Sequence, residues 1–162
     1  MTLAAINDLD PAGAKAAFLR CCGSERWARA MVEARPFDSL NRMIETGDAC
    51  WASLTPDDWL EAFAAHPQIG EQKSGSAWSA AEQAAAASAA ADERARLTAL
   101  NAAYRARFGY IFIVCATGRS AAEMLKLVEA RLSNDPAIEL RIAAEEQRRI
   151  TGLRLAKLIG DA

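Results

Sequence analysis

The sequence has a single histidine, His66, among its 162 residues, and this scarcity argues against most metal-centred chemistry. Its four cysteines are Cys21, Cys22, Cys50 and Cys115, and none of them forms a C-x-x-C pair. Because transition-metal sites need clustered His and Cys ligands, no metal site is expected, and multi-histidine hydrolases are excluded. The cysteines are interpreted as small buried hydrophobic residues in a reducing compartment, so the sequence predicts a cytoplasmic protein.

Long apolar runs and an excess of charge of one sign are also missing. No apolar stretch approaches the roughly 20 residues that span a bilayer, and the first residues lack the features of a signal peptide. The net charge is −2 without any stripe of Lys and Arg, so neither a membrane nor a nucleic acid is an expected partner. Hydrophobic residues make up 52% of the chain, which predicts one folded domain over residues 1–162.

Helix signals occupy most of the sequence and predict an all-α, multi-helix bundle. Capping side chains stand before amphipathic stretches, and glycine or proline follows several of them. Gly47 is expected to close the third helix, and Pro67 to end the next one at His66. Long helices are predicted from about residue 92 to 107 and from about 136 to 159. The predicted helix starts are Asp10-Pro11, Ser24, Asp38, Thr55-Pro56, Ser79 and Ser120.

One continuous apolar run extends from Phe108 to Gly118. It is too short for a helix and is bracketed by glycine, so it is predicted to be a short buried extended segment. An all-α protein offers this segment no neighbouring strand. Side chains, helix ends or a ligand must therefore satisfy its backbone N–H and C=O groups.

His66 is the first candidate for proton chemistry. Only histidine titrates near neutral pH without help from its surroundings, and Pro67 pushes the preceding residue out of the helical region. The imidazole is therefore expected at a corner of the chain, before residues 67–78, which lack periodicity and form a candidate binding loop. A structural imidazole at a helix end explains the position equally well.

Glu82 has both a structural and a functional interpretation. It stands three residues after Ser79, which is the spacing of a capping box. The same position places a carboxylate, with the Gln83 amide, at a helix N-terminus beside the loop, where polar or anionic ligands bind readily. Both interpretations hold only if the cap leaves one carboxylate oxygen free.

Arg154 lies on one predicted helix face with Ile150 and Leu158, because the three are spaced four apart. Its guanidinium either reaches out to solvent, which is the commoner outcome, or grips a buried carboxylate or ureido carbonyl. Four other arginines are interpreted as solvated surface charges. They are Arg131, Arg141, Arg148 and Arg149.

Several segments, taken in order, resemble a known family. They are His66-Pro67-Gln68-Ile69-Gly70, Trp78-Ser79-x-x-Glu82-Gln83, Asn101-x-x-Tyr104-x-x-Arg107 with the run that follows it, Arg131-Leu132-x-Asn134, Glu139-Leu140 and Ile150-Thr151-x-Leu153-Arg154. The sequence is similar to the 2-oxo-4-hydroxy-4-carboxy-5-ureidoimidazoline (OHCU) decarboxylases of urate degradation, from about Phe18 to its end.

The resemblance implies an all-α, cofactor-free and usually homodimeric carboxy-lyase that converts its small-molecule substrate to (S)-allantoin. It assigns the acid–base role to His66 and the key carboxylate to Glu82. Backbone groups of residues 112–116 would bind ring and ureido atoms. The implied substrate-binding residues are Pro67, Ser79, Ala80, Ala81, Glu82, Gln83, Phe112, Ile113, Val114, Cys115, Ala116 and Arg154, and no residue is a metal ligand.

The implied substrate can lose CO2 without pyridoxal or thiamine, because the carbon that bears its carboxylate adjoins an imine-type ring carbon that accepts electrons. The hypothesis is that His66 then donates a proton to one face of the ring. The competing hypothesis is a non-catalytic helical module that binds a ligand or partner through residues 67–78. The residues alone, without the resemblance, favour neither.

Overall fold

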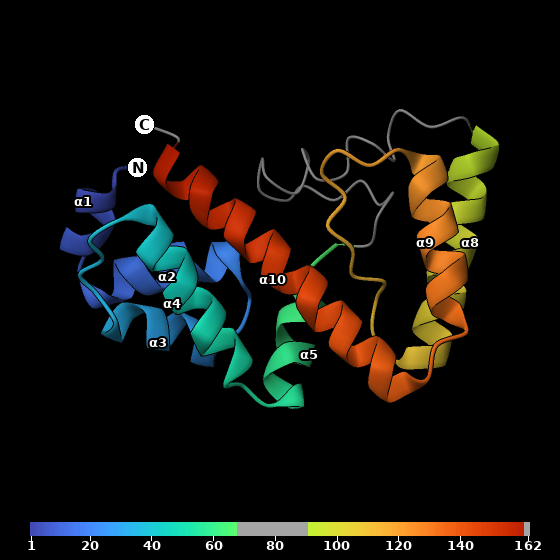
Figure 1. Ribbon diagram of the computed structural model, residues 1–162, viewed down its shortest axis with the longest axis horizontal. Helices are drawn as coiled ribbons and strands as arrows, with labels where there is room; N and C mark the ends of the chain where they lie inside the picture. Colours follow the sequence, from blue (N-terminus) through green and yellow to red (C-terminus); the bar gives the residue numbers. More distant parts are fainter. Residues whose placement is uncertain (68–90, 161–162) are drawn as a thin grey trace. The chain divides into compact units, whose positions relative to one another are not determined.

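The computed structural model describes residues 1–67 and 91–160 (Figure 1). These ranges contain eight α-helices and no strand, which confirms the predicted all-α class. The chain divides into two compact units, which we call unit 1 (Met1–Ala65 with Gln147–Ala162) and unit 2 (His66–Glu146). The helices are α1 Leu3–Asp8, α2 Pro11–Cys21, α3 Glu25–Glu33, α4 Leu40–Ala52, α5 Pro56–Ala64, α8 Ala91–Phe108, α9 Ala121–Leu132 and α10 Pro136–Gly160.

The predicted capping residues begin the helices of the described part of the chain, with one exception. Asp10 accepts the Gly13 N–H at 3.3 Å, and Ser24 and Ser120 cap α3 and α9 in the same way. Thr55 begins α5 through a reciprocal capping box. The exception is α4, whose cap is Ser39 and not Asp38. The short helix α1 lies before the first predicted start.

The prediction that Gly47 closes the third helix is wrong, because α4 continues through it to Ala52. Gly47 is buried, and its carbonyl accepts a hydrogen bond from Trp27 Nε1 at 3.0 Å. A Cβ at this position would lie 3.3 Å from Trp27 Cζ2. The glycine therefore allows close approach of the indole ring and does not end the helix.

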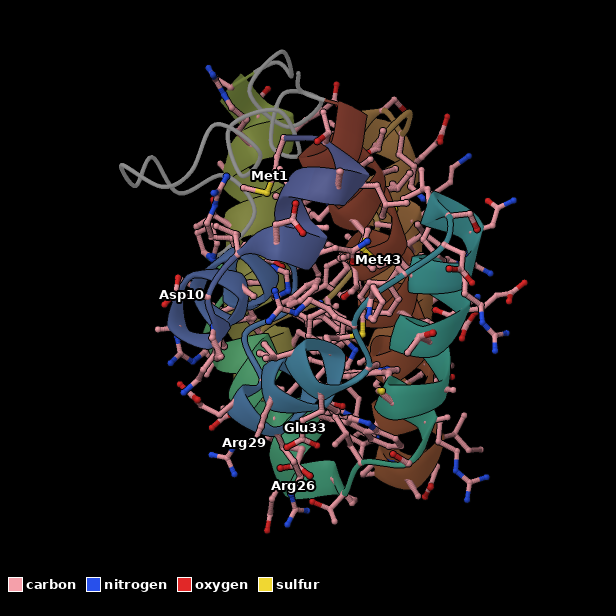
Figure 2. The ribbon with its side chains drawn as sticks, turned by 90° about the vertical axis from the view of Figure 1, so that its left-hand side faces the viewer. Met1, Asp10, Arg26, Arg29, Glu33 and Met43 are labelled. Carbon is pink, nitrogen blue, oxygen red and sulfur yellow. The ribbon has the colours of Figure 1, made fainter. Side chains whose placement is uncertain are left out.

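The core of unit 1 packs α2, α3, α4 and α5 around large apolar side chains. Phe18 and Trp27 are fully buried and meet edge to face, with ring centroids 6.1 Å apart. Figure 2 shows Met43 of α4 among these interior side chains, whereas Arg26 and Arg29 of α3 lie at the outer surface. This amphipathic arrangement is the one that the sequence periodicity predicts.

Unit 2 is built on α8 and α9, which lie side by side (Figure 1). The two helices run in the same direction, because residues 109–120 return along their length between the end of one and the start of the other. Phe112, Val114 and Ala116 enter the hydrophobic cluster of α8 and α9, while the buried Ile113 lies outside it. Alternate side chains thus take different sides, as in extended backbone. The predicted buried extended segment is confirmed for residues 111–116, whereas Phe108, where the prediction began, is the last residue of α8, and residues 117–118 form an exposed turn.

Glycine sets both ends of this returning segment. Gly109, at φ +85°, follows α8, and its N–H bonds to the Arg105 carbonyl at 2.8 Å. Gly118, at φ +79°, lies in a turn closed by the bond from Arg119 N–H to the Ala116 carbonyl. Across residues 1–67 and 91–160, no helix has the length and apolar character needed to cross a membrane.

Candidate active site

His66 lies at a bend immediately after α5, and both His66 and Pro67 are half-buried. The helix ends at Ala64, two residues before the predicted end, and the Ala65 N–H bonds back to the carbonyls of Ala62 and Phe63. The last turn is therefore tightened before proline redirects the chain. His66 is neither fully buried nor fully exposed.

α5, which ends two residues before His66, is anchored to the start of α3. The Glu61 carboxylate accepts the Glu25 N–H at 2.8 Å, so it satisfies a donor that the first turn of α3 leaves without a helical partner. Arg26 pairs with Asp58 at 3.3 Å. A hydrogen bond from the Thr55 backbone, with a smaller contribution from Arg26, holds the pKa of Asp58 below its usual value. These contacts hold α5 against the start of α3.

Gly23, just before α3, packs against that end of α5, and a Cβ there would lie 2.4 Å from the Ala65 Cβ. We expect Gly23→Ala to cost about 1–3 kcal/mol of the free energy of unfolding, because neither backbone can yield easily. Urea denaturation measures the loss. The control is Gly152→Ala in α10, where the nearest atom is Ile44 Cγ2 at 3.9 Å, so alanine there should be neutral or stabilising.

The double variant Gly23→Ala/Ala65→Gly removes the clash and should recover part of the stability lost in Gly23→Ala. Equal stability of Gly23→Ala and Gly152→Ala would contradict this packing explanation. It would also be contradicted if the double variant lost more stability than the sum of the losses in Gly23→Ala and Ala65→Gly.

The carbonyls of the buried segment from Ile111 to Ala116 differ in whether they accept a hydrogen bond. Arg131 Nη1 donates to the Ile113 carbonyl at 2.7 Å, and Arg119 Nε donates to the Cys115 carbonyl at 3.1 Å. The N–H and C=O groups of Phe112 and Val114 form no hydrogen bond with any residue of 1–67 or 91–160. Those two residues are only 2% and 5% exposed. Buried backbone groups need partners, so these polar atoms are available to a ligand.

The prediction that Arg131 is a solvated surface charge is wrong. Its side chain is 7% exposed, and its Nε lies 2.6 Å from Oε1 of the fully buried Glu139. The Tyr104 hydroxyl donates to the same oxygen at 2.6 Å, and Asn134 Nδ2 donates to the other at 2.9 Å. Burial and this hydrogen bond raise the pKa of Tyr104. Three donors around one carboxylate explain how this charge pair is tolerated in the interior.

The sequence alone does not identify these four residues as one interacting cluster, although the family motifs contain all of them. Arg131, Asn134, Glu139 and Tyr104 all stand in the motif segments that carry the family resemblance. Spacing alone could not find them, because Tyr104 and Glu139 are 35 positions apart.

Arg154 does not reach out to solvent, which was the commoner outcome expected from its helix face. It is 8% exposed and lies on α10 with Ile150 and Leu158, which are 6% and 3% exposed. Burial raises the pKa of Cys21 to about 12 and that of Cys22 to about 11, and the nearby positive charge of Arg154 opposes both shifts. Both thiols are therefore neutral at pH 7, so they are not the anions that Arg154 could neutralise.

The sequence-predicted site residues fall in different parts of the chain. His66, Pro67 and residues 112–116 belong to unit 2, and Arg154 belongs to unit 1. No group of three or more His, Cys, Asp or Glu suited to a metal ion occurs within the described ranges. Five predicted residues lie outside the described residues, namely Ser79, Ala80, Ala81, Glu82 and Gln83.

Comparison with known proteins decides the family. The sequence model of the OHCU decarboxylases matches residues 7–156, which is nearly the whole chain. The chain belongs to the OHCU decarboxylase family. The resemblance drawn from the motifs is thereby confirmed.

Individual OHCU decarboxylase relatives cover most of the chain. It is 43% identical over 148 residues to the uric acid degradation bifunctional protein TTL of Arabidopsis thaliana, covering 87% of this chain and 46% of that protein. The chain therefore spans about half the length of that relative. It is 28% identical over 160 residues to the OHCU decarboxylase of Haloferax volcanii, covering 97% of this chain and 95% of that one.

A solved structure of the family has the same fold. It is an OHCU decarboxylase crystallised in the presence of (S)-allantoin, and it is 42% identical in sequence with a TM-score of 0.80. The match covers 89% of this chain and 97% of that one.

Proposed function

We propose that this protein is a carboxy-lyase that converts OHCU to (S)-allantoin, without a cofactor, in urate degradation. Membership of the family over residues 7–156 is the observation that carries the proposal. The 42% identical OHCU decarboxylase crystallised with (S)-allantoin supports the same product. The reaction breaks the bond between the ring carbon and the carboxylate, CO2 leaves, and the electron pair moves into the adjacent imine system. A proton then bonds to the former imine carbon, and the hydroxyl on the carbon that lost CO2 gives up its proton to become a carbonyl, so that one proton is gained overall for each CO2 lost.

His66 is the proposed proton donor. It is the chain's sole imidazole and lies half-buried at the bend that follows α5. Delivery of the proton to one face of the ring yields a single enantiomer of the product, and histidine is the side chain most often used as a general acid. Glu82 is proposed to orient His66 or the ring N–H groups. Pro67, with the segment Ser79–Gln83, is proposed to complete the binding surface.

The backbone N–H and C=O groups of Phe112 and Val114 are proposed to bind the ureido group. A ureido group carries both N–H donors and a carbonyl acceptor, so it complements backbone that offers both kinds of group. The carbonyls of Ile113 and Cys115 already accept hydrogen bonds from arginine side chains. Within residues 112–116, the binding role is therefore assigned to the backbone groups of Phe112 and Val114. Arg154 is proposed to bind the carboxylate or ureido oxygen through paired hydrogen bonds.

The family resemblance also supports a homodimer that acts on a small molecule in the cytoplasm. Size-exclusion chromatography with light scattering tests the dimer directly. A single species at the monomer mass across the working concentration range would contradict it.

Product chirality tests the proposed function. Substrate is generated enzymatically from urate, and circular dichroism of the allantoin is followed with and without the protein. Spontaneous decay yields racemic allantoin, so an enzyme should produce an (S)-allantoin signal at a rate proportional to its concentration. A helical module that only binds ligand would leave the product racemic, and that result would refute the proposal.

A further inference from the structure

We infer that Arg131 is a positioning residue for this reaction. Held by Glu139, it fixes the Ile113 carbonyl and so sets the direction in which the backbone groups of Phe112 and Val114 face. The inference rests on the proposed function, because it takes the backbone of those two residues as the ureido-binding surface.

The direction follows from the geometry of extended backbone. Along such a segment, the N–H and C=O groups of neighbouring residues point to opposite sides, and those of alternate residues point to the same side. The carbonyls of Ile113 and Cys115 are both taken by arginine side chains. The four backbone groups of Phe112 and Val114 therefore face the other side, where no residue of the described ranges bonds them.

The Arg131 guanidinium is suited to hold this segment because it contacts the segment at both a carbonyl and an aromatic ring. Nη1 bonds the Ile113 carbonyl at 2.7 Å, while the guanidinium carbon lies 4.5 Å from the centre of the Phe112 ring. The same group uses Nε for Glu139. A lysine keeps the charge but has one compact ammonium on a flexible stem, so it cannot reproduce this planar arrangement.

Glu139 in turn is fixed by donors from two helices and from the turn that precedes α10. Arg131 belongs to α9 and Tyr104 to α8, while Glu139 stands in the first turn of α10, with Asn134 just before that helix. The arrangement ties the buried segment to all three helices. It is not proposed to contact the substrate, so its role is positioning and not catalysis.

Arg131→Lys tests the inference, because it keeps the buried positive charge opposite Glu139. We expect KM to rise about tenfold, the scale of one misplaced hydrogen bond, while kcat stays within about threefold and the product remains (S)-allantoin. Amide hydrogen exchange at Phe112 and Val114 should also become about tenfold faster, since the segment is less firmly held.

The matched control is Arg107→Lys. Arg107 also donates to a backbone carbonyl, that of Asn134 at 2.9 Å, but it is exposed and does not touch the segment. It should change neither KM nor exchange at Phe112 and Val114. Tyr104→Phe is the second variant, in case Arg131→Lys does not fold. It removes one donor to Glu139 and should raise KM about threefold with kcat retained.

The outcomes separate the two proposals. An unchanged KM in active Arg131→Lys enzyme, or in Tyr104→Phe if Arg131→Lys does not fold, overturns the positioning role and leaves the proposed function intact. A fall in kcat alone, or an equal effect in Arg107→Lys, also overturns it. Racemic product from the unaltered protein overturns the proposed function, and the role of Arg131 in this reaction fails with it.

Discussion

Replacing His66 with asparagine is expected to lower kcat by about a thousandfold, and the little allantoin that forms should be racemic. The size follows from the loss of the proposed general acid, since such a group typically contributes 10²–10⁴-fold. Asparagine keeps a polar side chain of similar size at the bend but has no proton to give near neutral pH. Single-turnover decay of the substrate, followed by circular dichroism of the product, measures both effects.

The fold should survive this change, because His66 is only half-buried and stands beyond the last turn of α5. The midpoint of urea unfolding is therefore the control, and it should match that of the unaltered protein to within about 1 kcal/mol. Formation of (S)-allantoin by His66→Asn at a rate near the original would show that the proton comes from another group.

Replacing Glu139 with alanine destabilises the fold by about 3–5 kcal/mol, because it leaves the buried Arg131 charge without its carboxylate. The Tyr104 hydroxyl and the Asn134 amide lose their acceptor in the same change. A domain of this size unfolds with about 5–15 kcal/mol, so the loss is a large share of the total. Urea unfolding monitored by tryptophan fluorescence measures it.

Glu129→Ala is the matched control for this experiment. Glu129 pairs with Arg96 between α9 and α8, but the two side chains are 40% and 63% exposed. Water screens such a pair, so its loss should cost less than about 1 kcal/mol. Similar losses in Glu139→Ala and Glu129→Ala would show that the buried pair contributes no more than a surface one.

A third variant separates stability from positioning. Arg131→Met/Glu139→Leu removes the unpaired buried charge and should recover part of the stability lost in Glu139→Ala, although the Tyr104 hydroxyl and the Asn134 amide still lack their acceptor. It still lacks the bond to the Ile113 carbonyl, so KM should stay raised. Recovery of both stability and KM would assign the pair a structural role only.

Features set by neighbouring residues could be predicted from the sequence. The caps at Asp10, Ser24, Thr55 and Ser120 each bond an N–H three positions away, so a short stretch of sequence contains the whole interaction. The buried extended segment was also predictable, because its composition and flanking glycines are local.

Features set by distant residues could not be predicted in this way. Gly47 lies inside α4 because of Trp27, 20 positions away, and the partner that buries Arg131 against the segment is Ile113, 18 positions away. A helix-ending glycine and a solvated arginine are the common outcomes, and tertiary packing overrides both here. The candidate site was predicted by family resemblance, since the residues alone left His66, Glu82 and Arg154 with two interpretations each.

The polar atoms of Phe112 and Val114 that are proposed to bind the ureido group belong to the main chain and not to side chains. Every amino acid except proline carries the same N–H and C=O, so conservative exchange of these two residues cannot erase the pattern of donors and acceptors. A change of substrate preference would therefore require a change in the orientation of these peptide groups, through Arg131 and Arg119, which hydrogen-bond to the neighbouring carbonyls. Replacement of Phe112 or Val114 by another residue would not be enough.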